Sequence, residues 1–167
     1  MGFALDKISL THLAGVHPDL CRVINDCARN GILPFTFGVS QGLRTVKEQK
    51  QDVAAGKSLT MASRHLDGHA ADLVVLVAGK ITWAWGPYYT LADQMRLAGI
   101  RCKVPLRWGG QWRALMADYT ESAMQESAAY VVAAKADGNA ILLDGPHYEL
   151  PVEFYPSGAH VPPTPTA

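Results

Sequence analysis

Residues 63–76, SRHLDGHAADLVVL, constrain the fold most, because a polar turn runs straight into an apolar segment. The apolar, β-branched run at residues 71–77 predicts a buried strand, which must pack inside a domain. Asp72 lies at the start of that run, where an ionised carboxylate is costly unless it is paired or coordinates a metal. The sequence therefore predicts a polar site mounted on the end of a buried strand.

The size and charge of the chain narrow its class. A chain of 167 residues fits one domain with a genuine core. Its 15 basic and 15 acidic residues balance, so the basic surface of a nucleic-acid-binding protein is not expected. The three cysteines include no C-x-x-C pair, so we expect reduced, mostly buried thiols rather than a disulfide framework or a thiolate metal site.

The chain also lacks the sequence features of a membrane or exported protein. Its first residues, MGFALDKISL, have no basic start followed by a long apolar core. No apolar run approaches the roughly 20 residues that cross a bilayer, so membrane insertion is not expected. We therefore expect synthesis as a soluble protein in the cytoplasm.

Hydrophobic periodicity and capping signals predict a mixture of helices and strands. Thr45 and Glu48 form a T-x-x-E capping box, which opens a short helix that ends before Gly56. Another helix is expected between Pro87 and Gly99. The remaining predicted helices cover residues 19–30 and 113–136, and the predicted strands cover residues 35–42, 71–77, 101–108, 141–143 and 147–150. Residues 153–167, rich in proline, predict an extended or disordered tail after a folded domain of residues 1–152.

His65 and Asp72 are candidate metal ligands. Zinc binds nitrogen and oxygen ligands at about 2 Å, and a catalytic site combines three protein ligands with an open position for water. Gly68 would let the loop between the two residues bend back towards the ion. Taken alone, the pair has a simpler structural explanation, in which Asp72 caps a turn and His65 lies on the surface.

A third candidate ligand, His147, lies in the segment LLDGPHYEL near the other end of the chain. Asp144 precedes it by three residues, and Pro146 fixes the backbone directly before it. This spacing would place Asp144 beside the open position, where a carboxylate can take a proton from the activated water, as in a hydrolase. The structural alternatives are that His147 is a core histidine bonded to the backbone and that Asp144 is an aspartate favoured in a turn. To replace the catalytic interpretation, both alternatives would have to be true at once.

The sequence resembles a known group of zinc peptidases at several motifs. SRHLDGHAAD, residues 63–72, matches the S-x-H-x-x-G-x-A-x-D signature of VanY-like peptidases, which are related to D-alanyl-D-alanine carboxypeptidases and to the sonic hedgehog fold. The resemblance is closer to phage endolysins of the L-alanyl-D-glutamate peptidase branch. There it extends to HPDL at residues 17–20, GLRT at 42–45 followed by Gln49, WGG at 108–110 and DGPH at 144–147.

The resemblance implies a fold and a set of functional residues. The fold would be a compact α+β domain in which helices flank a small antiparallel sheet. The domain would bind one zinc ion through His65, Asp72 and His147. Asp144 would be the catalytic acid or base.

Other residues of these motifs have two interpretations each. Arg44 would polarise the scissile carbonyl or bind a substrate carboxylate, although a structural ion pair explains it as well. Ser63 would contact the substrate or cap its loop. His69 matches no fixed position of the signature, so we expect it to support the site from outside the ligand set or to be exposed. Trp108 and Trp112 would pack in the core or line the cleft.

Two features depart from the family pattern. Gln111 stands where relatives have the acid of W-G-G-D-W, which puts any charge role of that position in doubt. Residues 113–136 look like an insertion between Trp112 and Asp144. The inserted helix could cover the cleft, extend the core or contact another part of the cell wall.

The resemblance implies hydrolysis of an amide bond in peptidoglycan stem peptides, with the L-alanyl-D-glutamate bond as the expected one. Such an enzyme of phage lysis is made in the host cytoplasm and reaches the wall through a membrane-permeabilising partner, a holin. We expect a monomer. The alternatives are a D-alanyl-D-alanine carboxypeptidase and a non-catalytic, zinc-stabilised binding module, and the retained Asp144 argues against the latter.

Overall fold

The structure, a computed structural model, describes residues 2–56, 58 and 60–158. Its elements follow in the order α1 (Lys7–His12), α2 (Pro18–Asn30), β1 (Thr36–Gln41), α3 (Val46–Ala54), the 3₁₀ helix η1 (Arg64–Asp67), β2 (Ala70–Val77), β3 (Lys80–Thr82), α4 (Trp85–Cys102), β4 (Arg107–Trp108), the 3₁₀ helix η2 (Met116–Asp118), α5 (Ala123–Ala136) and β5 (His147–Glu149). In the described chain the strands form an antiparallel sheet in the order β1-β2-β5-β4, with β3 paired to β2. The expected α+β fold, a small antiparallel sheet flanked by helices, is confirmed.

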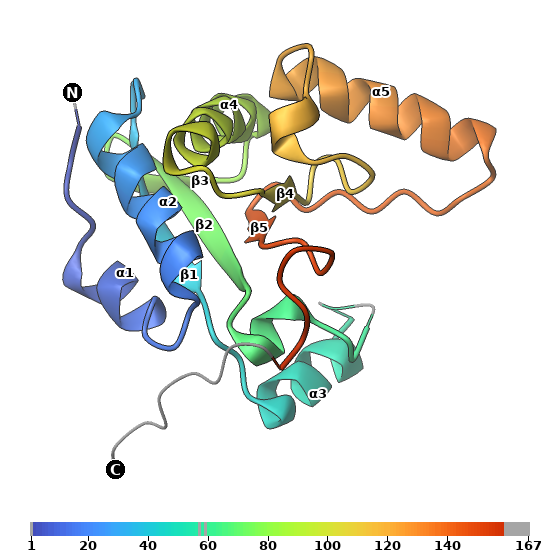
Figure 1. Ribbon diagram of the computed structural model, residues 1–167, viewed down its shortest axis with the longest axis horizontal. Helices are drawn as coiled ribbons and strands as arrows, with labels where there is room; N and C mark the ends of the chain where they lie inside the picture. Colours follow the sequence, from blue (N-terminus) through green and yellow to red (C-terminus); the bar gives the residue numbers. More distant parts are fainter. Residues whose placement is uncertain (1, 57, 59, 159–167) are drawn as a thin grey trace.

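Strand β2 separates the core from the polar site. Its side chains alternate, so that Ala71, Leu73 and Val75 are fully buried while Asp72 lies on the opposite face. Helices α2 and α4 pack against each other and share the core cluster with these buried residues (Figure 1). The core therefore lies on the helical side of β2, and Asp72 projects from the other side.

Helix α2 forms where the sequence predicts a helix. Pro18 occupies its first position, where the backbone N–H has no partner within a helix, so the N–H that proline lacks is not missed. Nδ1 of His17 caps the helix by accepting a hydrogen bond from the N–H of Asp19. The inward face is at most 1% exposed and consists of Leu20, Val23, Ile24, Cys27 and Ala28. The face of the helix predicted to be buried from the amphipathic pattern therefore packs in the core.

The boundaries expected for the helix between Pro87 and Gly99 were wrong, because α4 runs through both of these residues. Pro87 is the third residue of the helix, where an N–H has no partner within the helix, so proline is tolerated. Gly99 lies inside the last turn, and a Cβ there would come 3.1 Å from the carbonyl oxygen of Val104. Glycine thus lets the following chain fold back over the helix, which ends at Cys102 and is capped by Lys103 with a left-handed φ of 56°.

Two of the predicted strands were also wrong in extent. Of residues 101–108, only Arg107–Trp108 pair in the sheet as β4, because the first two residues still belong to α4. Residues 141–143 form a loop rather than a strand, and all three aliphatic side chains are exposed. β5 then covers His147–Glu149, close to the predicted strand at 147–150.

The inserted segment is not the single helix expected over residues 113–136. It contains the 3₁₀ helix η2 and then α5, which begins only at Ala123 because Ser122 and Gln125 form a capping box there. The guanidinium of Arg96 on α4 donates to the carbonyl oxygens of Met116 and Tyr119, which holds the non-helical part in place. α5 packs against α4 and lies on the side of the molecule away from α1 and α3 (Figure 1).

The first residues of the expected tail contact the domain. The hydroxyl of Tyr155 donates to Asp19 at 2.8 Å, and Arg64 donates to the carbonyl oxygen of Tyr155 at 2.6 Å. Residues 159–167 lie outside the described residues, so the division of the chain at residue 152 stays a prediction.

The remaining expectations concern membranes and thiols. Over the described ranges, none of the helices has both the length and the apolar character needed to cross a bilayer. The three cysteines are free thiols: Cys27 is buried, and Cys21 and Cys102 are partly buried. Burial raises the pKa of the Cys21 thiol to about 11 and that of the Cys27 thiol to about 12. These thiols therefore stay protonated at neutral pH, as expected of structural cysteines.

Candidate active site

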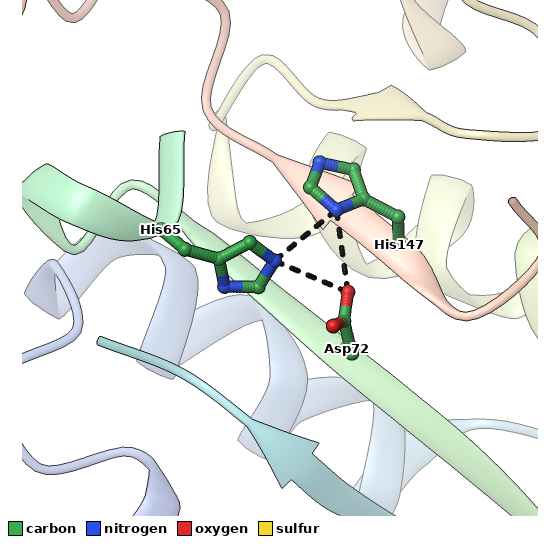
Figure 2. A group of neighbouring side chains, drawn as sticks. All are labelled: His65, Asp72 and His147. Atoms are coloured by element: carbon green, nitrogen blue, oxygen red, sulfur yellow. Dashed lines mark hydrogen bonds and ion pairs between the residues drawn. The ribbon is translucent and has the colours of Figure 1, made fainter. Parts of the chain in front are cut away.

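Three side chains predicted as ligands meet on the polar side of β2. Oδ1 of Asp72 lies 3.2 Å from both Nε2 of His65 and Nδ1 of His147, and the two nitrogens lie 3.3 Å apart (Figure 2). Both histidines are buried, at 2% and 7% exposed. Each side chain thus directs one possible metal-ligand atom, a nitrogen or an oxygen, towards a common point, in an arrangement that could hold a metal ion.

The sheet explains why residues so distant in sequence meet. Asp72 and His147 are paired positions in the β2 and β5 ladder, so their side chains leave the sheet on the same face. His65 reaches the same point from η1, which is connected to β2 by Gly68 with a left-handed φ of 72°. A Cβ on Gly68 would also come 2.3 Å from the carbonyl oxygen of Gly15, so this turn requires glycine.

A backbone carbonyl fixes the orientation of His65. Its Nδ1 lies 2.7 Å from the carbonyl oxygen of Gly42, which can only accept, so Nδ1 carries the hydrogen and Nε2 presents its lone pair. Gly42 itself is packed tightly, because a Cβ there would come 2.0 Å from the carbonyl oxygen of His12. This explains the glycine of the GLRT motif in structural terms.

Glu149 fixes the orientation of His147, and the sequence analysis missed this role. Oε2 of Glu149 lies 3.2 Å from Nε2 of His147, so Nε2 donates and Nδ1 is left with its lone pair towards Asp72. Glu149 is 8% exposed, and its other oxygen lies 3.5 Å from the guanidinium of Arg107 on β4. The two-residue spacing along β5, which puts both side chains on one face, is the sequence signal that could have identified it.

The spacing of the three donors fits a tetrahedral metal ion. Bonds of about 2.0 to 2.1 Å to zinc would set tetrahedral ligand atoms roughly 3.3 Å apart. The observed separations are 3.2, 3.2 and 3.3 Å. Two lone pairs and a carboxylate oxygen therefore converge on one point, which is favourable when a cation or a proton lies between them.

The carboxylates beside His147 favour its charged form. Burial opposes its charge, but hydrogen bonds with Asp72 and Glu149 raise the pKa of His147 to about 10. Burial likewise opposes ionisation of Asp72, but its hydrogen bond with His147 and the nearby imidazole of His65 hold its pKa well below the usual range. A metal ion bound here would therefore compete with a proton on His147.

Asp144 lines the same pocket as the three donors. It lies in a turn, where its N–H donates to the carbonyl oxygen of Gly109 at 2.9 Å and its own carbonyl accepts from the N–H of His147 at 3.2 Å. Gly109 must be glycine, since a Cβ there would come 2.3 Å from the carbonyl oxygen of Asp144. Burial raises the pKa of the Asp144 carboxyl above its ordinary value.

Arg44 is engaged in ion pairs and hydrogen bonds. Its side chain is 9% exposed, with the guanidinium 3.3 Å from Asp52 and 3.8 Å from Asp72, and it also donates to the side chains of Gln41 and Gln49. The structural ion pair considered for Arg44 is therefore present. Arg44 also lines the pocket, so both interpretations made from the sequence remain available.

The pocket has a volume of about 270 Å³ and a lining that combines polar and apolar residues. The lining includes the hydroxyl-bearing residues Ser58, Thr60 and Ser63, here called the hydroxyl-bearing wall, as well as Trp112 and Leu142. Ser63 also caps η1 by accepting a hydrogen bond from the N–H of His65, which is the loop role expected for it. The pocket therefore offers both polar and apolar contacts beside the three donor atoms.

The remaining residues of the motifs take structural positions. Trp108 is fully buried, and its indole donates to the carbonyl oxygen of Gly145 at 2.8 Å. Gln111 accepts a hydrogen bond from the backbone N–H of Arg113. His69 lies outside the donor group and is fully buried, with Nδ1 at 3.0 Å from Asp67. It is therefore not exposed, which was one of the two expectations for it.

Comparisons with known proteins agree with the motifs and the geometry. Residues 1–130 match the family described as phage L-alanyl-D-glutamate peptidase; this range includes His65 and Asp72 but ends before Asp144 and His147. The L-alanyl-D-glutamate peptidase of Escherichia phage T5 is 31% identical over 118 residues, which are 68% of this chain and 85% of that protein. The crystal structure of the Serratia marcescens L-Ala D-Glu endopeptidase ChiX matches with a TM-score of 0.68 and 35% identity, over 93% of this chain and 94% of that one. The chain belongs to the phage L-alanyl-D-glutamate peptidase family.

Proposed function

We propose that the protein is a zinc-dependent peptidoglycan peptidase that hydrolyses the L-alanyl-D-glutamate bond of the stem peptide. The observation that carries the proposal is the convergence of His65, Asp72 and His147 at tetrahedral spacing in a pocket that Asp144 also lines. The names of the relatives from phage T5 and Serratia marcescens support the choice of bond.

In this proposal His65, Asp72 and His147 bind the zinc ion. Two imidazoles and one carboxylate, with a fourth position open to the pocket, form the donor set of a catalytic rather than a structural zinc site. When bound, zinc acts as a Lewis acid that activates a water molecule for attack on the amide carbonyl. Glu149 and the carbonyl of Gly42 keep the two imidazoles oriented for this task.

Asp144 transfers the proton in the proposed reaction. Its carboxylate takes a proton from the attacking water as the new bond to the carbonyl carbon forms. The same proton then passes to the departing nitrogen as the carbon–nitrogen bond breaks. The products are a fragment that ends in the carboxylate of L-alanine and a peptide that begins with the free amine of D-glutamate.

Arg44 and Ser63 are assigned supporting roles. The guanidinium of Arg44 lies 3.8 Å from Asp72 and faces the pocket, so we propose that it stabilises the ligand carboxylate and attracts negative charge of the substrate. Ser63 holds the start of η1, and with it His65, while its position in the pocket wall allows contact with the stem peptide.

Mass spectrometry of defined muropeptides tests the proposal directly. The purified protein should release peptides that begin with D-glutamate, a chelator should stop this release, and added zinc should restore it. Loss of only the terminal D-alanine would instead assign a D-alanyl-D-alanine carboxypeptidase. Binding of muropeptides without any product would assign a non-catalytic binding module.

The biological setting follows from the activity that we propose. We propose that the enzyme is made in the host cytoplasm during phage infection and reaches peptidoglycan when a holin permeabilises the membrane. We also propose that it acts as a monomer. Expression in bacteria with and without a holin, followed by the turbidity of the culture, tests the first point, and sedimentation equilibrium tests the second.

A further inference from the structure

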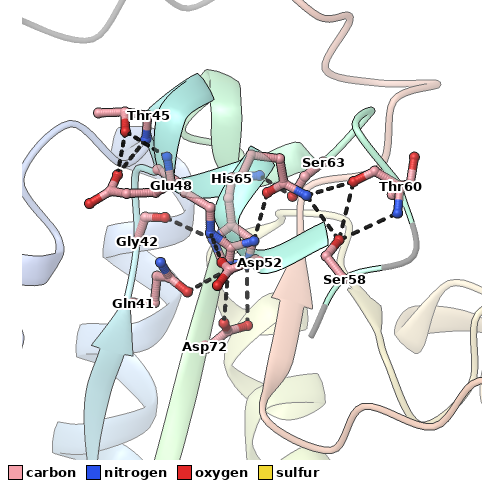
Figure 3. Close-up of polar contacts among 12 residues, drawn as sticks. Gln41, Gly42, Thr45, Glu48, Asp52, Ser58, Thr60, Ser63, His65 and Asp72 are labelled. Atoms are coloured by element: carbon pink, nitrogen blue, oxygen red, sulfur yellow. Dashed lines mark hydrogen bonds and ion pairs between the residues drawn. The ribbon is translucent and has the colours of Figure 1, made fainter. Parts of the chain in front are cut away.

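Gln49 on α3 is a fully buried amide that connects two parts of the pocket. It is 0% exposed, although it belongs to a short helix whose other side chains are mostly accessible. The capping box of Thr45 and Glu48 fixes the start of this helix, directly before Gln49 in the sequence (Figure 3). A buried amide is retained at little cost only when its donors and its acceptor are all used.

The oxygen of Gln49 is used by Arg44. Nη1 of Arg44 donates to Oε1 of Gln49 at 2.7 Å, while Nη2 lies 3.8 Å from the carboxylate of Asp72. The backbone N–H of Arg44 also donates to the carbonyl oxygen of His65 at 3.0 Å. Through Arg44, Gln49 is therefore joined to two of the three donor residues.

The nitrogen of Gln49 is used by the hydroxyl-bearing wall of the pocket. Nε2 donates to the carbonyl oxygen of Thr60 at 2.6 Å and to the hydroxyl of Ser58 at 2.9 Å. Ser58 in turn donates to the same carbonyl, and the hydroxyl of Thr60 accepts from the N–H of Ala62. Ser58, Thr60 and Ala62 all line the pocket, and Figure 3 shows the contacts between Ser58 and Thr60.

We propose that Gln49 is a positioning residue of the peptidase. Its amide holds Ser58 and Thr60 at a fixed distance from Arg44 and the metal site, so that the stem peptide binds with its scissile bond at that site. This inference rests on the proposed function for its substrate. The amide is suited to the task because one face accepts from a cation and the other donates to a carbonyl. No carboxylate or aliphatic side chain of the same size does both.

Two variants separate the two halves of this connection. Gln49→Glu keeps an acceptor for Arg44 but places a carboxylate against the carbonyl oxygen of Thr60, so it releases the wall alone. Gln49→Met removes both contacts at similar size. Gln51→Glu and Gln51→Met, at an exposed position of the same helix, are the matched controls.

Steady-state cleavage of a defined muropeptide, zinc content and amide hydrogen exchange are measured for all four variants. Gln49→Glu should retain zinc and most of kcat, raise KM by about tenfold or more because both hydrogen bonds donated by Nε2 are lost, and accelerate exchange at Thr60 and Ala62. Gln49→Met should show the same changes together with a lower kcat, because Arg44 also loses its partner. The controls should match the wild type in every respect.

The outcomes distinguish positioning from mere packing. If the Gln49 variants melt at lower temperature but keep the KM and the exchange rates of the controls, Gln49 only fills the core and the inference is overturned. If a variant fails to fold, Ser58→Ala, which removes one acceptor at the edge of the connection, must show the same rise in KM. If the wild type cleaves no muropeptide, the proposed function fails, and exchange at Thr60 and Ala62 alone decides the role of Gln49.

Discussion

Asp72 and His147 are directly opposite each other in the pairing of β2 with β5, and their side chains meet with Oδ1 3.2 Å from Nδ1. The register of two strands therefore sets the geometry of the site. A slip of one residue would turn His147 to the core face and bring Tyr148 into its place. The buried packing of Tyr148, at 0% exposed, opposes such a slip.

We expect the purified protein to bind about one zinc ion per chain through three ligands. Replacing any one of His65, Asp72 and His147 by Ala should lower the zinc that remains after dialysis, as measured by atomic emission. Chelation should abolish cleavage of peptidoglycan. Full zinc content in His147→Ala would exclude His147 from the ligand set.

Glu149→Ala should weaken zinc binding although Glu149 is not a proposed ligand. The variant loses the acceptor that holds the ring of His147, and the loss of such a partner typically lowers metal affinity about 10- to 100-fold. Glu149→Gln keeps an acceptor oxygen and should lie between this variant and the wild type. Glu153→Gln is the control, because Glu153 also pairs with Arg107 but is exposed. Competition with a chromophoric chelator measures the affinities, and equal values for Glu149→Ala and the control would disprove the role.

Asp144→Asn should separate catalysis from metal binding. The amide keeps the size of the side chain and suits the same turn, but it cannot accept a proton. Hydrolysis should fall on the order of 10²- to 10⁴-fold while zinc content stays unchanged. Near-normal cleavage of muropeptides would remove Asp144 from the mechanism.

The same variant makes a prediction about stability against pH. Burial raises the pKa of Asp144, so in the metal-free protein its ionised form destabilises the fold above that raised pKa. Metal-free Asp144→Asn should therefore unfold at higher urea concentration than metal-free wild type at pH 7. The difference should shrink as the pH falls through the raised pKa and vanish below the ordinary value of 3.8, where Asp144 is protonated in both states. A difference that grows on acidification would contradict the raised pKa.

The amides of the inserted segment should differ in hydrogen exchange, with stronger protection in α5 than in the residues between 113 and α5. Amides in the middle of α5 should exchange slowly, since Tyr130 and Ala134 are buried and the helix is capped at Ser122. Ser122→Ala removes the cap and should lower stability by about 1 kcal/mol. Uniform protection from residue 113 to 136 would instead restore the single helix predicted from the sequence.

The parts of the fold predicted from the sequence are those that local chemistry decides. The capping box of Thr45 and Glu48 depends on residues three apart, and the inward face of α2 depends on helical periodicity alone. Both were predicted and both are present. The limits of α4 were wrong because the sequence does not show that Pro87 lies in a first turn or that Gly99 is needed for close packing with Val104.

The residues of the site also divide into those that the sequence predicted and those that only the folded structure identifies. His65, Asp72 and His147 were grouped from a motif, and the structure brings their donor atoms together, while their roles stay predictions. The roles of Glu149 and Gln49 were not assigned from the sequence, although the two-residue spacing of Glu149 from His147 was a signal for the first of them. The function of Glu149 requires the register of β5 with β4, and that of Gln49 requires contacts with Arg44 and Thr60 that only the folded chain creates.

The separation of His65 and His147 by 82 positions has a consequence for folding. An ion held by both side chains would act as a removable cross-link that closes a long loop, and such a link stabilises a protein by restricting its unfolded chain. Because β5 pairs in the centre of the sheet, the link would also fasten the last strand of the domain to the first part of β2. The metal supply of the cell would then govern how long each enzyme molecule survives, in addition to how fast it works.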